Sequence, residues 1–151
     1  MRSRGVGRVL ALVSAIALTL TACSSGNSDG SADQTSDGTT DGGCAAAAGL
    51  SGPIEDRGTT PVCGGAITLD ATEFAFSPTC VEADGGQTLE VTMTNSGSAL
   101  HNLSVESLGI AEDVKAGDAI TVEVKLPDSG SVPFACKYHV ANGMQGAFLT
   151  G

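Results

Sequence analysis

The chain closes with the stretch Cys136-Lys-Tyr-His139-Val-Ala-Asn-Gly-Met144-Gln-Gly-Ala-Phe-Leu-Thr-Gly151. This stretch places a thiol, an imidazole and a thioether at Cys-x2-His-x4-Met spacing. Soft sulfur donors combined with imidazole favour copper among the common first-row metal ions. We therefore interpret this stretch as a copper-binding loop.

A trigonal copper site of this kind needs a second histidine beside the cysteine and a weak, distant methionine. The chain contains two histidines, and the other one is His101, at the end of an alternating apolar run. Taken singly, Cys136 and Met144 would be read as core residues, because both types pack readily in protein interiors. Their combination with both histidines at this spacing favours the metal site.

The region from Ala66 to Gly151 resembles the cupredoxins, and in particular their plastocyanin-like branch. The resemblance is carried by Phe76-Ser-Pro78, by the run from Asn95 to His101-Asn102, and above all by the loop Phe134-Ala-Cys136-x2-His139-x3-Gly143-Met144-x-Gly146. Two features depart from the common pattern: Cys80 replaces an ordinary apolar strand residue, and only residues 146–151 remain for the last strand.

The resemblance implies an all-β Greek-key sandwich or barrel that binds one type 1 (blue) copper ion. It also implies the ligands, which are His101, Cys136, His139 and Met144. Asn102, next to the first ligand, is our candidate for a supporting hydrogen bond that ties the two ligand segments together; the alternative is an ordinary turn asparagine.

The residue pattern independently predicts an all-β domain over residues 62–151. Several short segments alternate apolar or β-branched residues with polar ones, and Gly and Asp occupy the gaps between them. Such spacing is typical of a sandwich or barrel. The predicted strands span residues 66–69, 88–94, 103–105, 120–126 and 132–136.

The amino terminus is predicted to be an export signal. Arginines precede an uncharged stretch from Val9 to Leu20, which is shorter than the roughly 20 residues needed to span a bilayer. It ends in Leu20-Thr-Ala-Cys23, which looks like a bacterial lipobox. We interpret residues 1–22 as a signal peptide and expect a lipid on Cys23 that anchors the exported protein to the outer face of the cell membrane; the alternative is a secretory signal with a chance cysteine.

Residues 23–61 are predicted to form a disordered tether. The segment is rich in Ser, Gly, Asp and Thr, and such a composition cannot bury enough apolar area to fold. Binding of a cation by its aspartates is a weaker alternative, because gathering them would cost conformational entropy.

The charge of the chain excludes some partners. Three of the seven basic residues lie in the signal peptide, so four remain against seventeen acidic ones. Nucleic acid is therefore not expected as a partner, because phosphate binding needs a basic footprint. The acidity either steers encounters with basic proteins or keeps the protein soluble.

The cysteines outside the lipid and metal sites are Cys44, Cys63 and Cys80. An exported compartment permits a disulfide, and three pairings are open. We favour Cys63 with Cys80, because a hairpin turning near Ala71-Thr72 would bring them opposite each other. Cys44 would then be free or bonded to another molecule.

The function expected from this reading is single-electron transfer by Cu(I)/Cu(II) cycling between a redox protein donor and an acceptor. In relatives the histidine of the closing loop reaches the surface, so His139 would be the electron port. Val140, Ala141, Gly143 and Ala147 would then form a small docking patch around it.

An enzyme is not expected. A multicopper oxidase needs many more histidines, a catalytic zinc site usually keeps an open position among other ligand types, and both histidines are already assigned. The main rival is a copper carrier or storage protein that delivers the ion to an extracytoplasmic enzyme. A tethered interaction module with a structural metal is a third alternative, and the sequence names neither donor nor acceptor.

Overall fold

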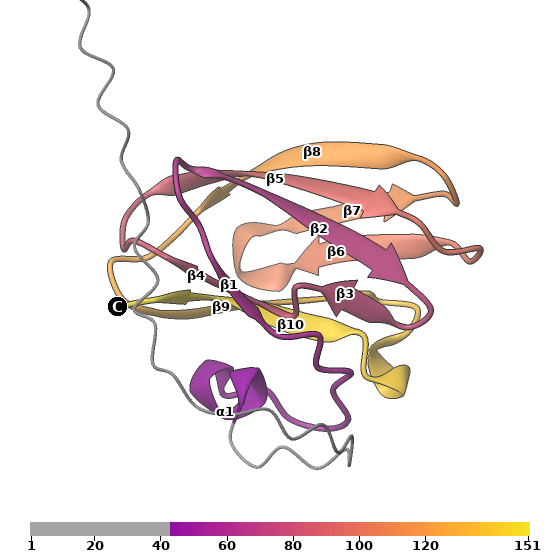
Figure 1. Cartoon of the computed structure of the whole chain (residues 1–151), viewed down its shortest axis with the longest axis horizontal. Helices are drawn as coiled ribbons and strands as arrows, with labels where there is room; N and C mark the ends of the chain where they lie inside the picture. Colours follow the sequence, from indigo (N-terminus) through magenta and orange to yellow (C-terminus); the bar gives the residue numbers. More distant parts are fainter. Residues whose placement is uncertain (1–42) are drawn as a thin grey trace, which may run out of the picture. The chain divides into compact units, whose positions relative to one another are not determined.

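The computed structural model describes residues 43–151 (Figure 1). The predicted signal peptide, Cys23 and the first part of the predicted tether lie outside the described residues. None of the helices within the described range has the length and hydropathy that crossing a bilayer requires.

Two sheets make up the described part of the chain (Figure 1). The large sheet contains, in spatial order, β1 (Thr59–Pro61), β4 (Cys80–Ala83), β10 (Gln145–Thr150), β9 (Gly130–Ala135), β6 (His101–Val105) and β7 (Ile110–Val114). The small sheet contains β3 (Ala75–Ser77), β2 (Ala66–Thr72), β5 (Thr88–Asn95) and β8 (Ala119–Lys125). The helical segments are α1 (Cys44–Ala48) and the 3-10 turns η1 (Glu106–Leu108) and η2 (Val140–Asn142). The all-β prediction is confirmed, and the five predicted strands correspond to β2, β5, β6, β8 and β9.

Alternation along each strand decides which side chains enter the core. In β5 the apolar Leu89, Val91 and Met93 are fully buried, while the residues between them are exposed or half-buried. Successive strand residues point to opposite faces, so this pattern turns one face of the small sheet inward.

Three phenylalanines join the sheets across the core. Phe76 of β3 meets Phe134 of β9 edge to face, with ring centroids 5.2 Å apart, and Phe134 lies 4.8 Å from Phe148 of β10. All three are nearly or completely buried. Full burial of one such side chain contributes about 1.5–3 kcal/mol, so this cluster is a main attachment between the layers.

The segment 43–61 is part of the folded domain, so the predicted disordered tether extends too far toward residue 61. Helix α1 packs its Cys44 and Ala48 into a small buried cluster with Cys80 and Ala147. Strand β1 then pairs in parallel with β4, residue Thr59 opposite Cys80. The physical reason is local composition: Cys44-Ala-Ala-Ala-Ala48 is a good helix former with an apolar face, which an average over a Ser- and Gly-rich stretch conceals.

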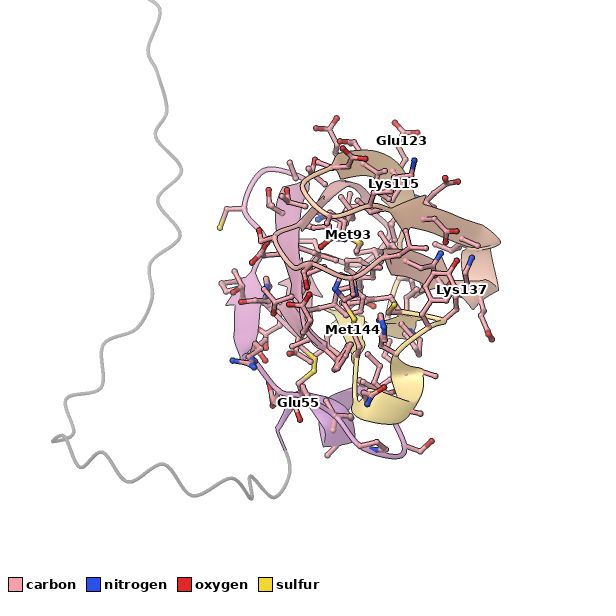
Figure 2. The ribbon with its side chains drawn as sticks, turned by 90° about the vertical axis from the view of Figure 1, so that its right-hand side faces the viewer. Glu55, Met93, Lys115, Glu123, Lys137 and Met144 are labelled. Atoms are coloured by element: carbon pink, nitrogen blue, oxygen red, sulfur yellow. A yellow bond between two sulfur atoms is a disulfide. The ribbon has the colours of Figure 1, made fainter. Side chains whose placement is uncertain are left out.

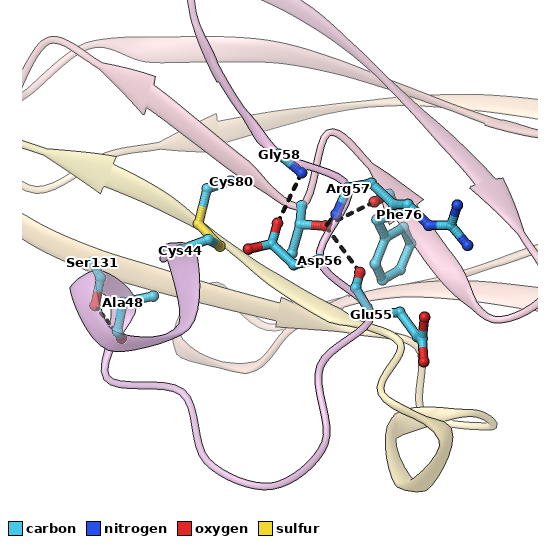
Figure 3. Close-up of a disulfide and its surroundings, with 10 residues drawn as sticks. Cys44, Ala48, Glu55, Asp56, Arg57, Gly58, Phe76, Cys80 and Ser131 are labelled. Atoms are coloured by element: carbon cyan, nitrogen blue, oxygen red, sulfur yellow. Dashed lines mark hydrogen bonds between the residues drawn. A yellow bond between two sulfur atoms is a disulfide. The ribbon is translucent and has the colours of Figure 1, made fainter. Parts of the chain in front are cut away.

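A disulfide joins Cys44 to Cys80, with Cα atoms 5.6 Å apart (Figure 3). The predicted Cys63–Cys80 pairing is therefore wrong. Strands β2 and β3 do form a hairpin, with Asp70 opposite Ser77, but the chain then leaves the small sheet and enters the large sheet at β4. This crossover carries Cys80 away from the start of β2 and toward α1. Cys136 is the free cysteine of the described part of the chain.

Candidate metal centre

Three neighbouring strands of the large sheet bring the candidate ligands to one end of the sheet. His101 opens β6, Cys136 directly follows β9, and Met144 directly precedes β10. Strand β9 is antiparallel to both β6 and β10, so these strand ends meet at the same edge. His139 lies in the loop between Cys136 and Met144, immediately before η2.

The donor atoms of three residues converge. The Sγ atom of Cys136 lies 3.4 Å from Nδ1 of His139 and 4.0 Å from Nδ1 of His101. The three donor atoms all lie within 4.8 Å of one another. Metal bonds of about 2.0 Å to nitrogen and 2.3 Å to sulfur at trigonal angles would separate sulfur and nitrogen by roughly 3.7 Å. The observed distances bracket this value, so one ion fits between the three groups.

Backbone hydrogen bonds fix the loop that carries three of the four candidate ligands. The N–H of Cys136 donates to the carbonyl of Met144 at 3.0 Å, and the N–H of Met144 donates to the carbonyl of His139 at 3.2 Å. The N–H of His139 donates back to the carbonyl of Cys136 at 3.0 Å. The side chain of Met144 is fully buried. The loop is thus closed on itself, with the thioether residue adjoining the cysteine and histidine.

Burial favours the neutral form of the inner histidine. His101 is completely buried, and this burial lowers its pKa. The neighbouring His139 lowers the pKa of His101 further. A neutral imidazole is the form that binds a metal ion. The Nε2 atom of His101 is buried without a hydrogen-bond partner, whereas its Nδ1 faces the sulfur of Cys136. The group of two imidazoles and a thiol, two of the three completely buried and with a thioether residue adjoining, matches the donor preferences of copper.

The family follows from a comparison with known domains. Residues 45–149 match the model of the cupredoxin-like domain. The chain belongs to this family. The match begins within α1, in agreement with a domain that starts well before residue 62, and it confirms the resemblance predicted from the sequence. No curated protein sequence matches this cupredoxin significantly.

Solved structures share the fold at low sequence identity. Dithionite-reduced auracyanin from the photosynthetic bacterium Roseiflexus castenholzii is 18% identical and aligns with a TM-score of 0.50, covering 60% of this chain and 99% of that one. The Cu(I)-bound metal-binding domain of the Cu(I)-exporting P-type ATPase from Streptococcus pneumoniae is 16% identical, with a TM-score of 0.54 and coverage of 63% and 97%. Auracyanin B is 14% identical, with a TM-score of 0.51 and coverage of 66% and 96%. At these identities the likeness establishes the fold.

The two histidines of this cupredoxin differ in exposure. The ring of His139 is half-buried, and it packs against Phe74 with centroids 4.5 Å apart and against His101 at 5.0 Å. Of the four residues predicted to surround His139, Val140 and Ala141 are exposed, whereas Gly143 and Ala147 are buried. Ala147 points into the cluster under α1 because it lies in β10, which is covered there.

The side chain of Asn102 forms no hydrogen bond with the Cys136–Met144 loop. The prediction that Asn102 ties the two ligand segments together by its own hydrogen bond is therefore wrong. Its Nδ2 donates to Oδ1 of Asp113 at 2.9 Å, and its Oδ1 accepts from the hydroxyl of Ser104. The two residues Asn102 and Asp113 are register partners on β6 and β7. A side chain on β6 therefore reaches the neighbouring strand before it reaches the loop.

Asp113 supplies the link that was expected of Asn102. Its Oδ2 accepts from the hydroxyl of Tyr138 at 2.8 Å, and its Oδ1 lies 2.8 Å from Nζ of Lys137. Lys137, at the surface in Figure 2, is the residue after Cys136. The hydrogen bond from Lys137, followed by those from Tyr138 and Asn102, holds the pKa of Asp113 below its usual range. The sequence gives no signal for this residue, which reads as an ordinary exposed strand acid.

Two further side chains shape the turn before His101. Asn95 is fully buried, and its Nδ2 donates to the carbonyls of Ala99 and Val114 at 2.8 Å each. The carboxylate of Glu73 accepts from the N–H of Ser98 and from the N–H of Ala99 at 3.0 Å. These backbone hydrogen bonds lower the pKa of Glu73 to about 2. The chain therefore enters β6 along a path fixed on both sides, which sets where His101 stands.

Proposed function

We propose that this cupredoxin is a type 1 (blue) copper protein that carries single electrons between redox partners. His101, Cys136 and His139 would hold the ion, with Met144 as the weak fourth ligand. The observation that carries the proposal is the convergence of Cys136 Sγ with two imidazole Nδ1 atoms at 3.4 and 4.0 Å, in a site where Cys136 and His101 are completely buried. Bound copper would supply the Cu(I)/Cu(II) couple.

The protein contributes a site that moves little. His101 is fixed at the start of a paired strand, and the loop from Cys136 to Met144 is closed by its own backbone hydrogen bonds. Cu(I) and Cu(II) prefer different ligand geometries, and a fixed set of ligands suits each of them only approximately. Because the ligands hold their positions, little rearrangement accompanies each electron transfer. Rigidity of the donor set therefore favours fast electron exchange.

The route of the electron would pass through His139. Cys136, His101 and Met144 are completely buried, whereas the ring of His139 is half-buried. Exposed apolar side chains flank the two histidines in sequence: Tyr138 and Val140 lie on either side of His139, and Leu100 precedes His101, each between 42% and 45% exposed. A redox protein docking there would come nearer to the site than on any face where the ligands are covered.

The same burial weighs against the rival function of copper delivery. Handing over an ion requires an incoming ligand to reach it, and three of the four proposed ligands are inaccessible. An enzymatic role is also not proposed, because both histidines of the chain belong to this group and leave no imidazole for a separate catalytic site.

The cellular setting is proposed from the sequence. The Arg-rich start, the apolar stretch and Leu20-Thr-Ala-Cys23 support export and a lipid anchor on Cys23. The partners would then be extracytoplasmic redox proteins, and the acidic balance of the chain suits partners with basic surfaces.

Repeated redox cycling separates electron transfer from copper delivery. The full-length protein, loaded with one equivalent of copper, is reduced with ascorbate and reoxidised with ferricyanide several times in the presence of a competing Cu(I) chelator. Electron transfer predicts that the copper stays on the protein through every cycle. Loss of the ion to the chelator on first reduction would instead favour the carrier function.

A further inference from the structure

Residues 49–57, which we call the strap, lie against the loop that carries Met144. The N–H of Glu55 in the strap donates to the carbonyl of Gly143 at 3.0 Å. The two segments approach so closely that a Cβ atom on Gly143 would lie 3.0 Å from the nitrogen of Glu55. Gly143 also has φ of 94°, which favours glycine. Gly143, the residue before Met144, thus has the backbone conformation and the lack of a side chain that this contact requires, and the hydrogen bond from Glu55 fixes it.

The residue after Met144 is held by the strap as well. The side-chain amide of Gln145 donates to the carbonyl of Ser51 at 3.0 Å and to the carbonyl of Pro53 at 2.8 Å. Gln145 is only 8% exposed. Both amide hydrogens are therefore used on strap carbonyls in a site nearly shut off from water, where an unmade hydrogen bond is costly.

Both ends of the strap are fixed to the domain. At its start, the Cys44–Cys80 disulfide and a 2.9 Å hydrogen bond from Ser131 Oγ to the carbonyl of Ala48 hold α1 in place (Figure 3). At its end, the N–H of Arg57 donates to Thr79 Oγ1 at 2.7 Å. The strap is thus a short bridge between two anchors rather than a loose extension.

The anchors converge on the strand that follows Met144. Cys80 stands opposite Ala147 in the parallel pairing of β4 with β10, and the N–H of Ala147 donates to the carbonyl of Thr79 at 3.1 Å. The backbone of Met144 itself forms hydrogen bonds with the backbones of His139 and Cys136. Residues 143–145 therefore lie between the cysteine and histidine loop and the strap.

We propose that the strap is a positioning element of the metal centre, in which Gln145 and the backbone of Glu55 hold Met144 at a set place relative to Cys136. The inference rests on the proposed copper function. An axial ligand tunes the redox potential of a cupredoxin copper, and groups behind metal ligands typically account for 10–100-fold in affinity. The amino-terminal extension would in this way adjust a site to which it contributes no ligand.

The test uses full-length protein with Gln145→Met, which keeps the size of the side chain and removes both donors. Gln87→Met is the matched control, since Gln87 adjoins β5 at the end opposite Asn95 and its Nε2 has no hydrogen-bond partner. In metal-free protein, Gln145→Met should speed hydrogen exchange at the amides of Glu55 and Met144. In copper-loaded protein, it should weaken Cu(I) affinity by roughly tenfold and shift the reduction potential, while Gln87→Met leaves all three unchanged.

A second variant keeps the proposal testable if Gln145→Met does not fold. Cys44→Ala with Cys80→Ala frees the start of the strap and should shift affinity and potential in the same direction. Wild-type values in the folded strap variants would overturn the proposal, provided that the parent protein shows a thiolate-to-copper band. A parent protein without that band would overturn the proposed function instead, so the two failures are distinguishable.

Discussion

The side-chain amide of Asn102 donates a hydrogen bond to the carboxylate of Asp113 at 2.9 Å. Asn102 follows His101 in the sequence. The same carboxylate accepts a hydrogen bond from the hydroxyl of Tyr138 and forms an ion pair with Lys137, and both residues lie in the loop between Cys136 and His139. A single acid on β7 therefore joins the strand of one histidine to the loop of the other.

Removing this acid should loosen the metal centre. We predict that Asp113→Ala lowers copper affinity by roughly tenfold, because the strand of His101 and the Cys136 loop lose their shared acceptor. Asp113→Asn should recover part of the affinity, since one acceptor oxygen remains. The measurement is competition with a copper chelator. Glu112→Ala, an exposed neighbour on the same strand, is the control, and equal affinities for Asp113→Ala and Glu112→Ala would contradict the role of Asp113.

Glu73 should make stability depend on acidity. Its pKa falls from an ordinary 4.5 to about 2 in the folded protein, mainly through the backbone of Ser98. The unfolded chain therefore binds the proton more readily, and the stabilisation is complete above pH of about 4.5 and is lost as the pH falls toward about 2. We predict that the difference in melting temperature between wild type and Glu73→Gln shrinks over this interval. A difference that stays constant across it would contradict the prediction.

The Cys44–Cys80 disulfide should stabilise the domain substantially. It closes a loop with a sequence separation of 36, for which chain entropy gives about 4 kcal/mol. Replacing both cysteines with alanine should lower the free energy of unfolding in denaturant titrations by an amount of that order. Digestion without reduction should also release the peptides of Cys44 and Cys80 as one linked species. Recovery of Cys80 linked to Cys63 would show the pairing described here to be wrong.

The surface beside His139 should control how electrons leave. We predict that Val140→Asp slows electron self-exchange by roughly tenfold at low salt, because two copies approaching through this face would bring like charges together. The visible spectrum should not change. Leu108→Asp is a matched control, with 39% exposure against 43% for Val140 and a position at the other end of β6. Equal slowing by both variants would mean that exchange does not pass near Val140.

The candidate ligands could be predicted from sequence because their information is local. Cys136, His139 and Met144 share one loop, and the composition leaves a single further histidine, His101. The strands could also be predicted from the sequence, because the alternation of apolar residues in segments such as β5 directly reflects which side faces the core. Neither inference depends on which strands are neighbours.

The supporting structure could not be predicted because it depends on strand order and register. Asp113 meets Asn102 only because β6 and β7 pair in one particular register. Cys80 meets Cys44 because the chain changes sheets after β3, and the strap reaches Gln145 because α1 is fixed on β10. The signal peptide and the lipid on Cys23 lie outside the described residues and stay predictions.

The visible absorption spectrum of the full-length protein with one equivalent of Cu(II) tests the central claim most directly. A copper–thiolate bond at Cys136 predicts an intense band near ~600 nm that bleaches with ascorbate, returns on reoxidation and is absent from Cys136→Ser. A folded protein that binds copper without this band, or a band that survives in Cys136→Ser, would contradict the account.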